Sequence, residues 1–330
     1  MGIPEWIGLR MTKIGRIILI IVVIVAIITV IPLFIDLSPV GTVTNAVELA
    51  DPDSLFVEID DLTVHYKMAG SGETVLIMLH GFGSNVYSWE KVLNPLSSDG
   101  TVIAYDWVGF GLTSRPLSGS WSGENPYSTT GQVKLLIKLM DHLGIEKAVL
   151  VGNSAGALIA GETAITHPER VIGLILVDPA LNGTQFSPFV SWLIKTPQMD
   201  GIGPFLSRQI VVRGDDFIKS AWHDPSLITD ETYNGYRKPL EMVGWDYGLW
   251  EFTKADKENV LEKVDKLDLP VLVMTGSDDR IIPTKYSIEL SGLIPGAELV
   301  VIDNAGHVPQ EEKPEEFIRI VNDFIARLPN

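Results

Sequence analysis

The stretch that decides the fold runs from Val149 to Gly156 and reads VLVGNSAG. A β-branched apolar run leads into a G-x-S-x-G sequence, and a small-residue stretch with helical character follows over Ala155–Thr166. This pattern is typical of a strand that turns sharply into a helix, where glycines leave room for crowded backbone and the serine hydroxyl is exposed. The stretch therefore predicts a nucleophile at the end of a buried strand.

Short apolar runs alternate with helical patterns along most of the chain, which favours an α/β fold with a largely parallel sheet. The predicted strands are Leu55–Ile59, Thr63–Met68, Thr74–Leu79, Val102–Tyr105, Ala148–Val151, Val171–Val177, Val271–Met274 and Leu299–Ile302. The clearest predicted helices are Thr130–Leu143, Ala155–Thr166 and Pro314–Leu328. Residues 181–268 show no clear strand and carry many aromatic residues, so we expect a helical insertion there.

The composition of the 330 residues excludes several classes of protein. The net charge of −17, from 42 acidic and 25 basic residues, argues against a nucleic-acid-binding protein. The absence of cysteine removes disulfides, thiolate nucleophiles and cysteine-ligated metals. An apolar fraction of 46% with 20% charged residues is that of a folded chain.

The N-terminal region is unusually apolar. Ile17–Ile35 carries no charge, and a helix of that length would span about 28 Å, close to the thickness of a bilayer core. Basic residues precede this run and the next one comes only at Lys67, which predicts that the N-terminus is cytoplasmic. We therefore expect a cytoplasmic segment 1–13, a transmembrane helix 14–35, a linker 36–53 and an extracytoplasmic domain 54–330.

Two alternatives for the N-terminal run remain open. A cleaved signal peptide has a shorter apolar core and a small-residue cleavage site, and Thr44-Asn45-Ala46 is only a weak match to such a site. A buried core helix is the other alternative, although a terminal helix that is apolar on all sides is uncommon in a soluble domain.

Three residues in the order serine, aspartate, histidine follow three predicted strands. Ser154 stands in the G-x-S-x-G sequence, Asp279 follows the strand Val271–Met274, and His307 follows the last predicted strand. A serine hydroxyl needs a base, and that base needs an acid that fixes its tautomer. Since the carboxyl ends of parallel strands share one edge of a sheet, we expect these side chains to meet there as a catalytic triad.

Two backbone amides are candidates for an oxyanion hole. The strand Thr74–Leu79 ends in the turn HGFGS, from His80 to Ser84, and the serine motif opens a helix at Ala155. Backbone N–H groups in such positions can stabilise an oxygen that becomes negative during acyl transfer. We assign the N–H groups of Phe82 and Ala155 to this role and regard His80 as structural. No metal or organic cofactor is implied.

The chain from about residue 54 to 328 resembles the α/β-hydrolase superfamily. The matching segments are HGFGS at His80–Ser84, DWVGFGLT at Asp106–Thr113, GNSAG around Ser154, GSDDRIIP at Gly276–Pro283 and GHVP at Gly306–Pro309. The resemblance implies a mostly parallel eight-stranded sheet flanked by helices, with residues 181–268 as a helical cap. It also selects Asp279 over Asp278 as the acid, because the family's acid stands three residues after the strand-end glycine.

The sequence differs from the motifs of several branches of the superfamily, which narrows the set of branches that it resembles. Dehalogenases and epoxide hydrolases of this fold use an aspartate where this chain has Ser154, and proline iminopeptidases carry a Gly-Gly-Pro loop that is absent. C–C bond hydrolases share the GNS triplet but have a glycine-richer oxyanion loop. The chain is therefore most similar to carboxylesterases and to monoacylglycerol lipases with an N-terminal membrane anchor.

The sequence predicts a membrane-anchored serine hydrolase of carboxylic esters, with lipid or other apolar acyl esters as substrates. Apolar residues of the insertion would line the acyl pocket. The alternatives are a C–C bond hydrolase or an amidase of the same fold. A ligand-binding protein on a hydrolase scaffold is a further alternative, because fold does not fix function.

Overall fold

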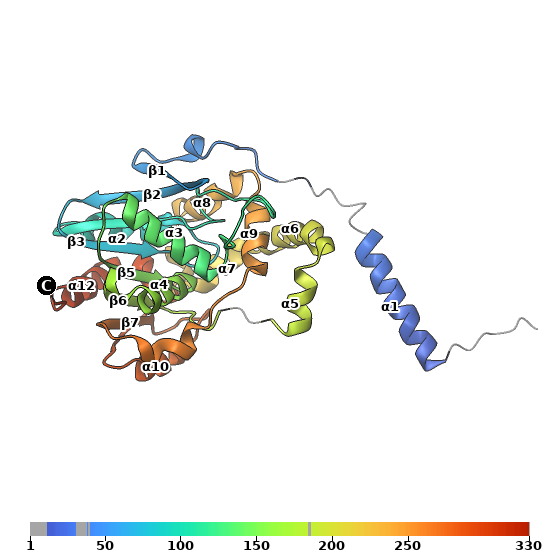
Figure 1. The fold of residues 1–330 in the computed structure, drawn as a ribbon. Helices are drawn as coiled ribbons and strands as arrows, with labels where there is room; N and C mark the ends of the chain where they lie inside the picture. The colour runs from blue at the N-terminus through green and yellow to red at the C-terminus, as the bar shows by residue number, and fades with distance from the viewer. Residues whose placement is uncertain (1–11, 31–37, 39, 184–185, 330) are drawn as a thin grey trace, which may run out of the picture.

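The centre of the molecule is an eight-stranded sheet with helices on both faces (Figure 1). The computed structural model describes residues 12–30, 38, 40–183 and 186–329. The strands are β1 Ser54–Ile59, β2 Leu62–Gly70, β3 Thr74–Leu79, β4 Gly100–Tyr105, β5 Ala148–Asn153, β6 Val171–Val177, β7 Val271–Gly276 and β8 Glu298–Ile302. They lie in the order β1-β2-β4-β3-β5-β6-β7-β8. The predicted mostly parallel eight-stranded sheet is confirmed.

The strand directions follow the sequence pattern. β1 and β2 form an antiparallel hairpin at one edge, β2 pairs antiparallel with β4, and all the later pairings are parallel. The central strand β5 is buried at each of its six residues, as expected for a strand covered on both faces. The parallel arrangement brings the carboxyl ends of β3, β5, β6, β7 and β8 to one edge of the sheet.

Two apolar cores lie on the two faces of this sheet. The first joins the sheet to α3 Thr129–His142, α4 Ala155–Thr166 and α10 Thr284–Leu293. The second joins it to α2 Glu90–Leu96 and α12 Pro314–Ile325, whose Phe317, Val321 and Phe324 are almost fully buried. The short helix α11 Pro309–Glu312 precedes α12.

The described residues between β6 and β7 form helices and no strand. These helices are α5 Pro188–Ile194, α6 Pro197–Val211, α7 Gly214–Ala221, α8 Asp230–Arg237 and α9 Trp245–Lys254, with 3₁₀ turns η5 Pro225–Leu227, η6 Lys238–Glu241 and η7 Val260–Lys266. Further 3₁₀ turns are η2 Ala46–Leu49, η3 Val86–Trp89 and η4 Pro168–Arg170. We call residues 186–268 the cap. Helices α6 and α9 of the cap lie at one end of the sheet (Figure 1).

The predicted transmembrane helix, and with it the predicted membrane location, is wrong. Among the described residues, no helix is both long enough and apolar enough to span a bilayer. Helix α1 covers Lys13–Val30, so its first turn contains Lys13 and Arg16. The rest of the predicted span, 31–35, lies outside the described residues.

Part of the predicted linker is docked on the cap. Val43 forms an isolated bridge with Met242, and the N–H groups of Thr42 and Val43 donate to the carbonyl of Glu241. Asp51 also forms ion pairs with Lys238 and Lys67. The stretch from residue 40 onward is therefore attached to the domain and is not a free tether.

A buried aspartate, Asp106, joins strand β2 to the loops that follow β3 and β4. The Asp106 carboxylate lies 2.6 Å from His65 Nδ1 and accepts hydrogen bonds from the backbone N–H groups of Val86 and Leu112. His65 Nε2 lies 2.8 Å from Ser54 Oγ, so a partly buried serine extends the buried histidine–aspartate pair. Burial opposes ionisation of Asp106, but His65 and these donors keep the pKa of its carboxyl below the ordinary value.

We expect Asp106→Asn to lower the free energy of unfolding by about 3–5 kcal/mol, because the change removes one member of a buried, fully bonded group. Urea unfolding followed by circular dichroism measures the effect. Asp141→Asn is the control, since the Asp141–Arg170 pair involves a carboxylate that is 60% exposed and contributes at most about 1 kcal/mol. Equal losses in the two variants would contradict the assigned role of Asp106.

Candidate active site

Ser154 occupies a strained turn between β5 and α4. Its backbone has φ 53° and ψ −118°, a region that residues other than glycine rarely adopt. A Cβ atom at Gly152 would lie 2.6 Å from Ala157 Cα, and one at Gly156 would lie 2.3 Å from the carbonyl oxygen of Leu79. The two glycines are therefore required by the close approach of β5 to α4 and of α4 to β3.

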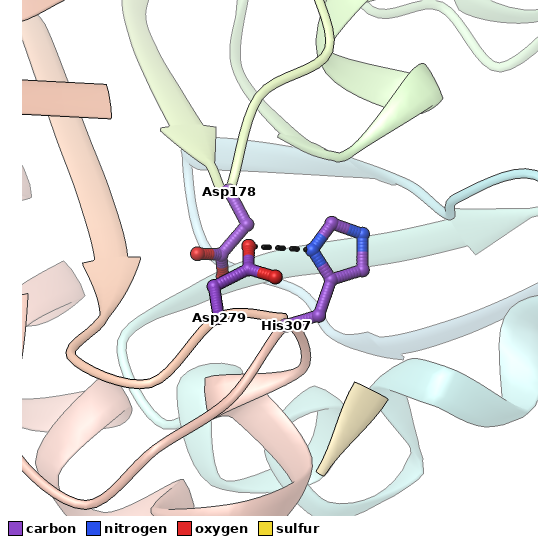
Figure 2. A group of neighbouring side chains, drawn as sticks. All are labelled: Asp178, Asp279 and His307. Atoms are coloured by element: carbon purple, nitrogen blue, oxygen red, sulfur yellow. Dashed lines mark hydrogen bonds and ion pairs between the residues drawn. The ribbon is translucent and has the colours of Figure 1, made fainter. Parts of the chain in front are cut away.

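Asp279 and His307 form a buried pair at the same edge of the sheet. His307 Nδ1 lies 2.7 Å from Asp279 Oδ2, and the side chains are 6% and 0% exposed (Figure 2). The other carboxylate oxygen of Asp279 accepts hydrogen bonds from the backbone N–H groups of Ile281 and Ile282 at 2.7 and 2.9 Å. This bonding holds the carboxylate in place as a hydrogen-bond acceptor for a proton on His307 Nδ1, and in that tautomer Nε2 is free to accept a proton.

The loop that carries His307 is tied to the residue before Ser154. The amide of Asn153 donates to the carbonyl oxygens of His307 at 3.1 Å and of Val177 at 3.3 Å. In the described chain, Ser154 Oγ and His307 Nε2 are not joined by a hydrogen bond. The structure thus joins two of the three predicted triad residues directly and places Ser154 at the same edge of the sheet, at the end of β5, which β6 separates from β7. Long or missing hydrogen bonds between such groups are common in enzymes without substrate.

The two predicted oxyanion amides lie on either side of Ser154. A Cβ atom at Gly81 would lie 3.2 Å from Ser154 Cβ, so the turn containing Phe82 packs against the serine. Ala155 is the first residue of α4, where N–H groups have no partner within the helix. Within the described residues, neither the Phe82 nor the Ala155 N–H donates to a protein acceptor. Both groups are therefore available to an oxygen of a ligand.

Aromatic side chains from the sheet loops and the cap meet beside this turn. The ring of Phe82 lies 5.8 Å from that of Phe110 and 5.6 Å from that of Phe252 on α9, measured between centroids. Phe110 also contacts Trp107 at 4.6 Å. Phe82 is 36% exposed, while the other three rings are buried. We call these four residues the aromatic wall.

Two further residues of this edge have unusual electrostatics. His80 is completely buried, and burial lowers the pKa of its imidazole to about 4, so it is neutral and serves as a structural residue. Asp178, which sequence reasoning missed, follows β6 and is also completely buried. Burial and the neighbouring Asp279 raise the pKa of Asp178 well above its usual range. The feature of the sequence that could have indicated Asp178 is its position directly after the predicted strand Val171–Val177.

The described residues contain one cluster with the spacing of metal ligands. Donor atoms of Asp178, Asp279 and His307 lie within 4.8 Å of one another. Hydrogen bonds already engage His307 Nδ1, both oxygens of Asp279 and one oxygen of Asp178. The cluster is therefore a hydrogen-bonded network that supports the histidine.

A serine on a strained strand-to-helix turn, beside a histidine–aspartate pair at the carboxyl edge of a parallel sheet, defines the site of a hydrolase-type protein. Comparison with known families agrees with this class. A model of the "Alpha/beta hydrolase family" matches residues 76–320, and the chain belongs to this family.

Individual relatives are similar over most of their length. A 2-hydroxy-6-oxononadienedioate/2-hydroxy-6-oxononatrienedioate hydrolase of Burkholderia vietnamiensis is 30% identical over 81% of this chain and 92% of that protein. A meta-cleavage product hydrolase from Pseudomonas fluorescens has a structure with a TM-score of 0.64 at 27% identity, covering 82% of this chain and 97% of that one. An enol-lactonase from Burkholderia xenovorans shares the fold, with a TM-score of 0.68 at 20% identity over 83% and 100% of the two chains. The sequence predicted that the chain is most similar to carboxylesterases and monoacylglycerol lipases, whereas these relatives are C–C bond hydrolases and an enol-lactonase.

The strain at Ser154 predicts a measurable difference between two inactive variants. We expect Ser154→Gly to have a free energy of unfolding about 1 kcal/mol higher than Ser154→Ala, because glycine relieves the positive φ while alanine retains it. Both variants remove the same hydroxyl, so each serves as the control for the other in thermal and urea unfolding. A less stable glycine variant would contradict the strain.

A second prediction concerns Glu311, which joins the His307 loop to the cap. Tyr236 of α8 donates to its carboxylate, and burial raises the pKa of Glu311 to about 8. In the unfolded chain this pKa is about 4.3. Between these values the folded state holds a proton that the unfolded state has lost, so Glu311 makes the domain less stable as the pH rises.

We therefore expect Glu311→Gln to gain stability relative to the native protein as the pH rises from about 5 to 8, by at least about 1 kcal/mol. Urea unfolding at several pH values measures this difference. Glu316→Gln, at an exposed position of α12, is the control. A constant difference between Glu311→Gln and the native protein would refute the titration of Glu311.

Proposed function

We propose that the chain is a serine hydrolase in which Ser154 is the nucleophile, His307 the base and Asp279 the acid that orients His307. The observation that carries this proposal is the strained backbone of Ser154 beside the buried Asp279–His307 pair. Strain of this kind costs about 1–3 kcal/mol and persists where function selects it. This backbone conformation would not stabilise the fold if Ser154 had only a structural role.

The geometry supports a two-step reaction at a carbonyl carbon. His307 Nε2 takes the proton of Ser154 Oγ as the oxygen bonds to that carbon, and the carbonyl oxygen becomes negative between the N–H groups of Phe82 and Ala155. The leaving group departs with the proton from His307. Water then repeats the sequence on the acyl-enzyme, returning the proton to Ser154 and releasing a carboxylic acid.

For the substrate class we propose ketones in which the bond to be broken is a C–C bond, the alternative reading of the sequence. The support comes from a relative named as a hydrolase of 2-hydroxy-6-oxo dienoates, at 30% identity over 92% of its length. Such substrates suit this site, because the departing carbon is stabilised as an enolate and receives its proton from His307. The aromatic wall offers an apolar surface to the acyl group.

Hydrolysis of carboxylic esters, including lipid esters, is the second candidate. It uses the same three side chains and the same two N–H groups, and differs only in having an alcohol as the leaving group. The half-exposed ring of Phe82 at the oxyanion turn favours it, since this ring can contact an apolar acyl chain directly. The two candidates are therefore separated by substrate preference and not by the triad.

A panel of substrates tests the proposal. We expect kcat/KM for a 2-hydroxy-6-oxo-2,4-dienoate to exceed that for p-nitrophenyl esters and monoacylglycerols by at least about 100-fold, since specificity resides in differential transition-state binding. Absorbance of the dienoate and of p-nitrophenolate reports the rates, and chromatography detects released fatty acid.

Ser154→Ala is the control and should lose at least about 10⁴-fold in kcat with every active substrate. A higher kcat/KM for esters would move the assignment to the second candidate. Turnover that survives Ser154→Ala would remove the proposed nucleophile, and absence of turnover with all substrates would favour a ligand-binding protein.

A further inference from the structure

Asp178 stands at the carboxyl end of β6, between the serine strand and the strand that leads to Asp279. Its backbone has φ 44°, and its N–H donates to the carbonyl of Met274 on β7 at 2.8 Å. The side chain is completely buried and directed toward Asp279 (Figure 2). A positive φ and a buried carboxyl group are both costly, so the position calls for a physical reason.

The two carboxyl oxygens of Asp178 differ in their hydrogen bonds. Oδ1 accepts from Thr275 Oγ1 at 2.7 Å and from the Gly276 N–H at 3.1 Å, whereas Oδ2 is buried with no donor in reach. No lysine or arginine of the described chain forms an ion pair with it. The buried Asp246 differs, because Arg208 lies 2.8 Å from its carboxylate. An ionised Asp178 would thus leave a buried oxygen without compensation.

The neighbour of Asp178 supplies the missing partner. One carboxylate oxygen of Asp178, one of Asp279 and a ring nitrogen of His307 all lie within 4.8 Å of one another. Ionising two buried carboxyl groups this close together is costly, which favours a proton on one of them. Asp279 is the better hydrogen-bond acceptor of the two, because it is paired with His307 and accepts two backbone N–H groups.

We propose that Asp178 holds a proton at Oδ2 and donates it in a hydrogen bond to Asp279, so that the two carboxyl groups act as one acid carrying a single negative charge. Asp178 is then a positioning residue: it fixes the carboxylate that orients His307 and does not itself touch substrate. The catalytic consequence of this inference rests on the proposed function. The protonation of Asp178 is independent of that function.

Burial and the charge of Asp279 both raise the pKa of Asp178, in the direction that this arrangement requires. The titratable groups that face Asp178 are Asp279, from the loop after β7, and His307, from the loop after β8. At alkaline pH, loss of the proton would place two negative charges side by side. The arrangement should therefore fail as the pH rises.

Infrared spectroscopy of the full chain tests the protonation without any activity. At pH 7 we expect C=O stretches from two buried protonated carboxyl groups, Asp178 and Glu311. Asp178→Asn should remove the first and keep the second, Glu311→Gln should do the reverse, and the matched control Asp246→Asn should keep both. A spectrum in which Asp178→Asn removes only carboxylate absorption would overturn the proposal, whatever reaction the protein catalyses.

Kinetics test the positioning role on a substrate of the native protein. We expect Asp178→Ala to lower kcat about 10- to 100-fold with little change in KM, as for loss of one hydrogen bond to a charged group. Asp178→Asn should recover most of this loss, because a carboxamide can still donate to Asp279 and accept from Thr275 and Gly276. It should also move the alkaline fall of kcat to higher pH, since it cannot ionise.

A purely structural role of Asp178 would leave the pH profile of Asp178→Asn unchanged, and that result would overturn the positioning role. An Asp178→Asn variant as impaired as Asp178→Ala would overturn it as well. If no substrate is turned over, the proposed function fails alone, and the infrared result still decides whether the two carboxyl groups share a proton.

Discussion

The tight turn at Ser154 is the constraint on which the rest of the site depends. A positive φ at a serine is stable only because β5, α4 and β3 approach closely on both sides, at positions where any Cβ would collide with backbone. The Ser154 N–H donates to the carbonyl of Val177, which draws the end of β6 to the same place. Once this turn is fixed, the loops after β3 and β6 have little freedom.

The cap is joined to the loops that carry the site. The backbone N–H of His307 donates to the carbonyl of Ala221 at 2.6 Å, and Tyr236 donates to Glu311, which follows in the same segment. The ring of Phe252 from α9 meets the ring of Phe82 at the oxyanion turn. A displacement of the cap would therefore move His307 and the turn that contains Phe82 together.

Sequence reasoning predicted the sheet well, because buried parallel strands are continuous β-branched runs and each predicted strand has a counterpart in β1–β8. The order of residues at strand ends indicated His307 and an aspartate after β7, and the family resemblance selected Asp279 over Asp278 as its partner. Sequence reasoning missed Asp178, whose contact with Asp279 depends on the adjacency of β6 and β7, and no local pattern encodes strand order.

The other differences have similar physical causes. The transmembrane prediction was wrong, since no helix among the described residues is both long enough and apolar enough to span a bilayer. The linker prediction missed the bridge between Val43 and Met242, a pairing between segments about 200 residues apart. Contacts across such distances are set by the folded domain and leave no periodic signal in the sequence.

The central claim is that the Asp279–His307 pair activates Ser154 as a nucleophile. The most direct measurement is the reaction of the native protein with a fluorophosphonate, followed by mass spectrometry of its peptides. We predict a single adduct on Ser154, formed much more slowly in His307→Gln. An unmodified protein, an adduct on another residue, or a rate that is unchanged in His307→Gln would contradict this account of the site.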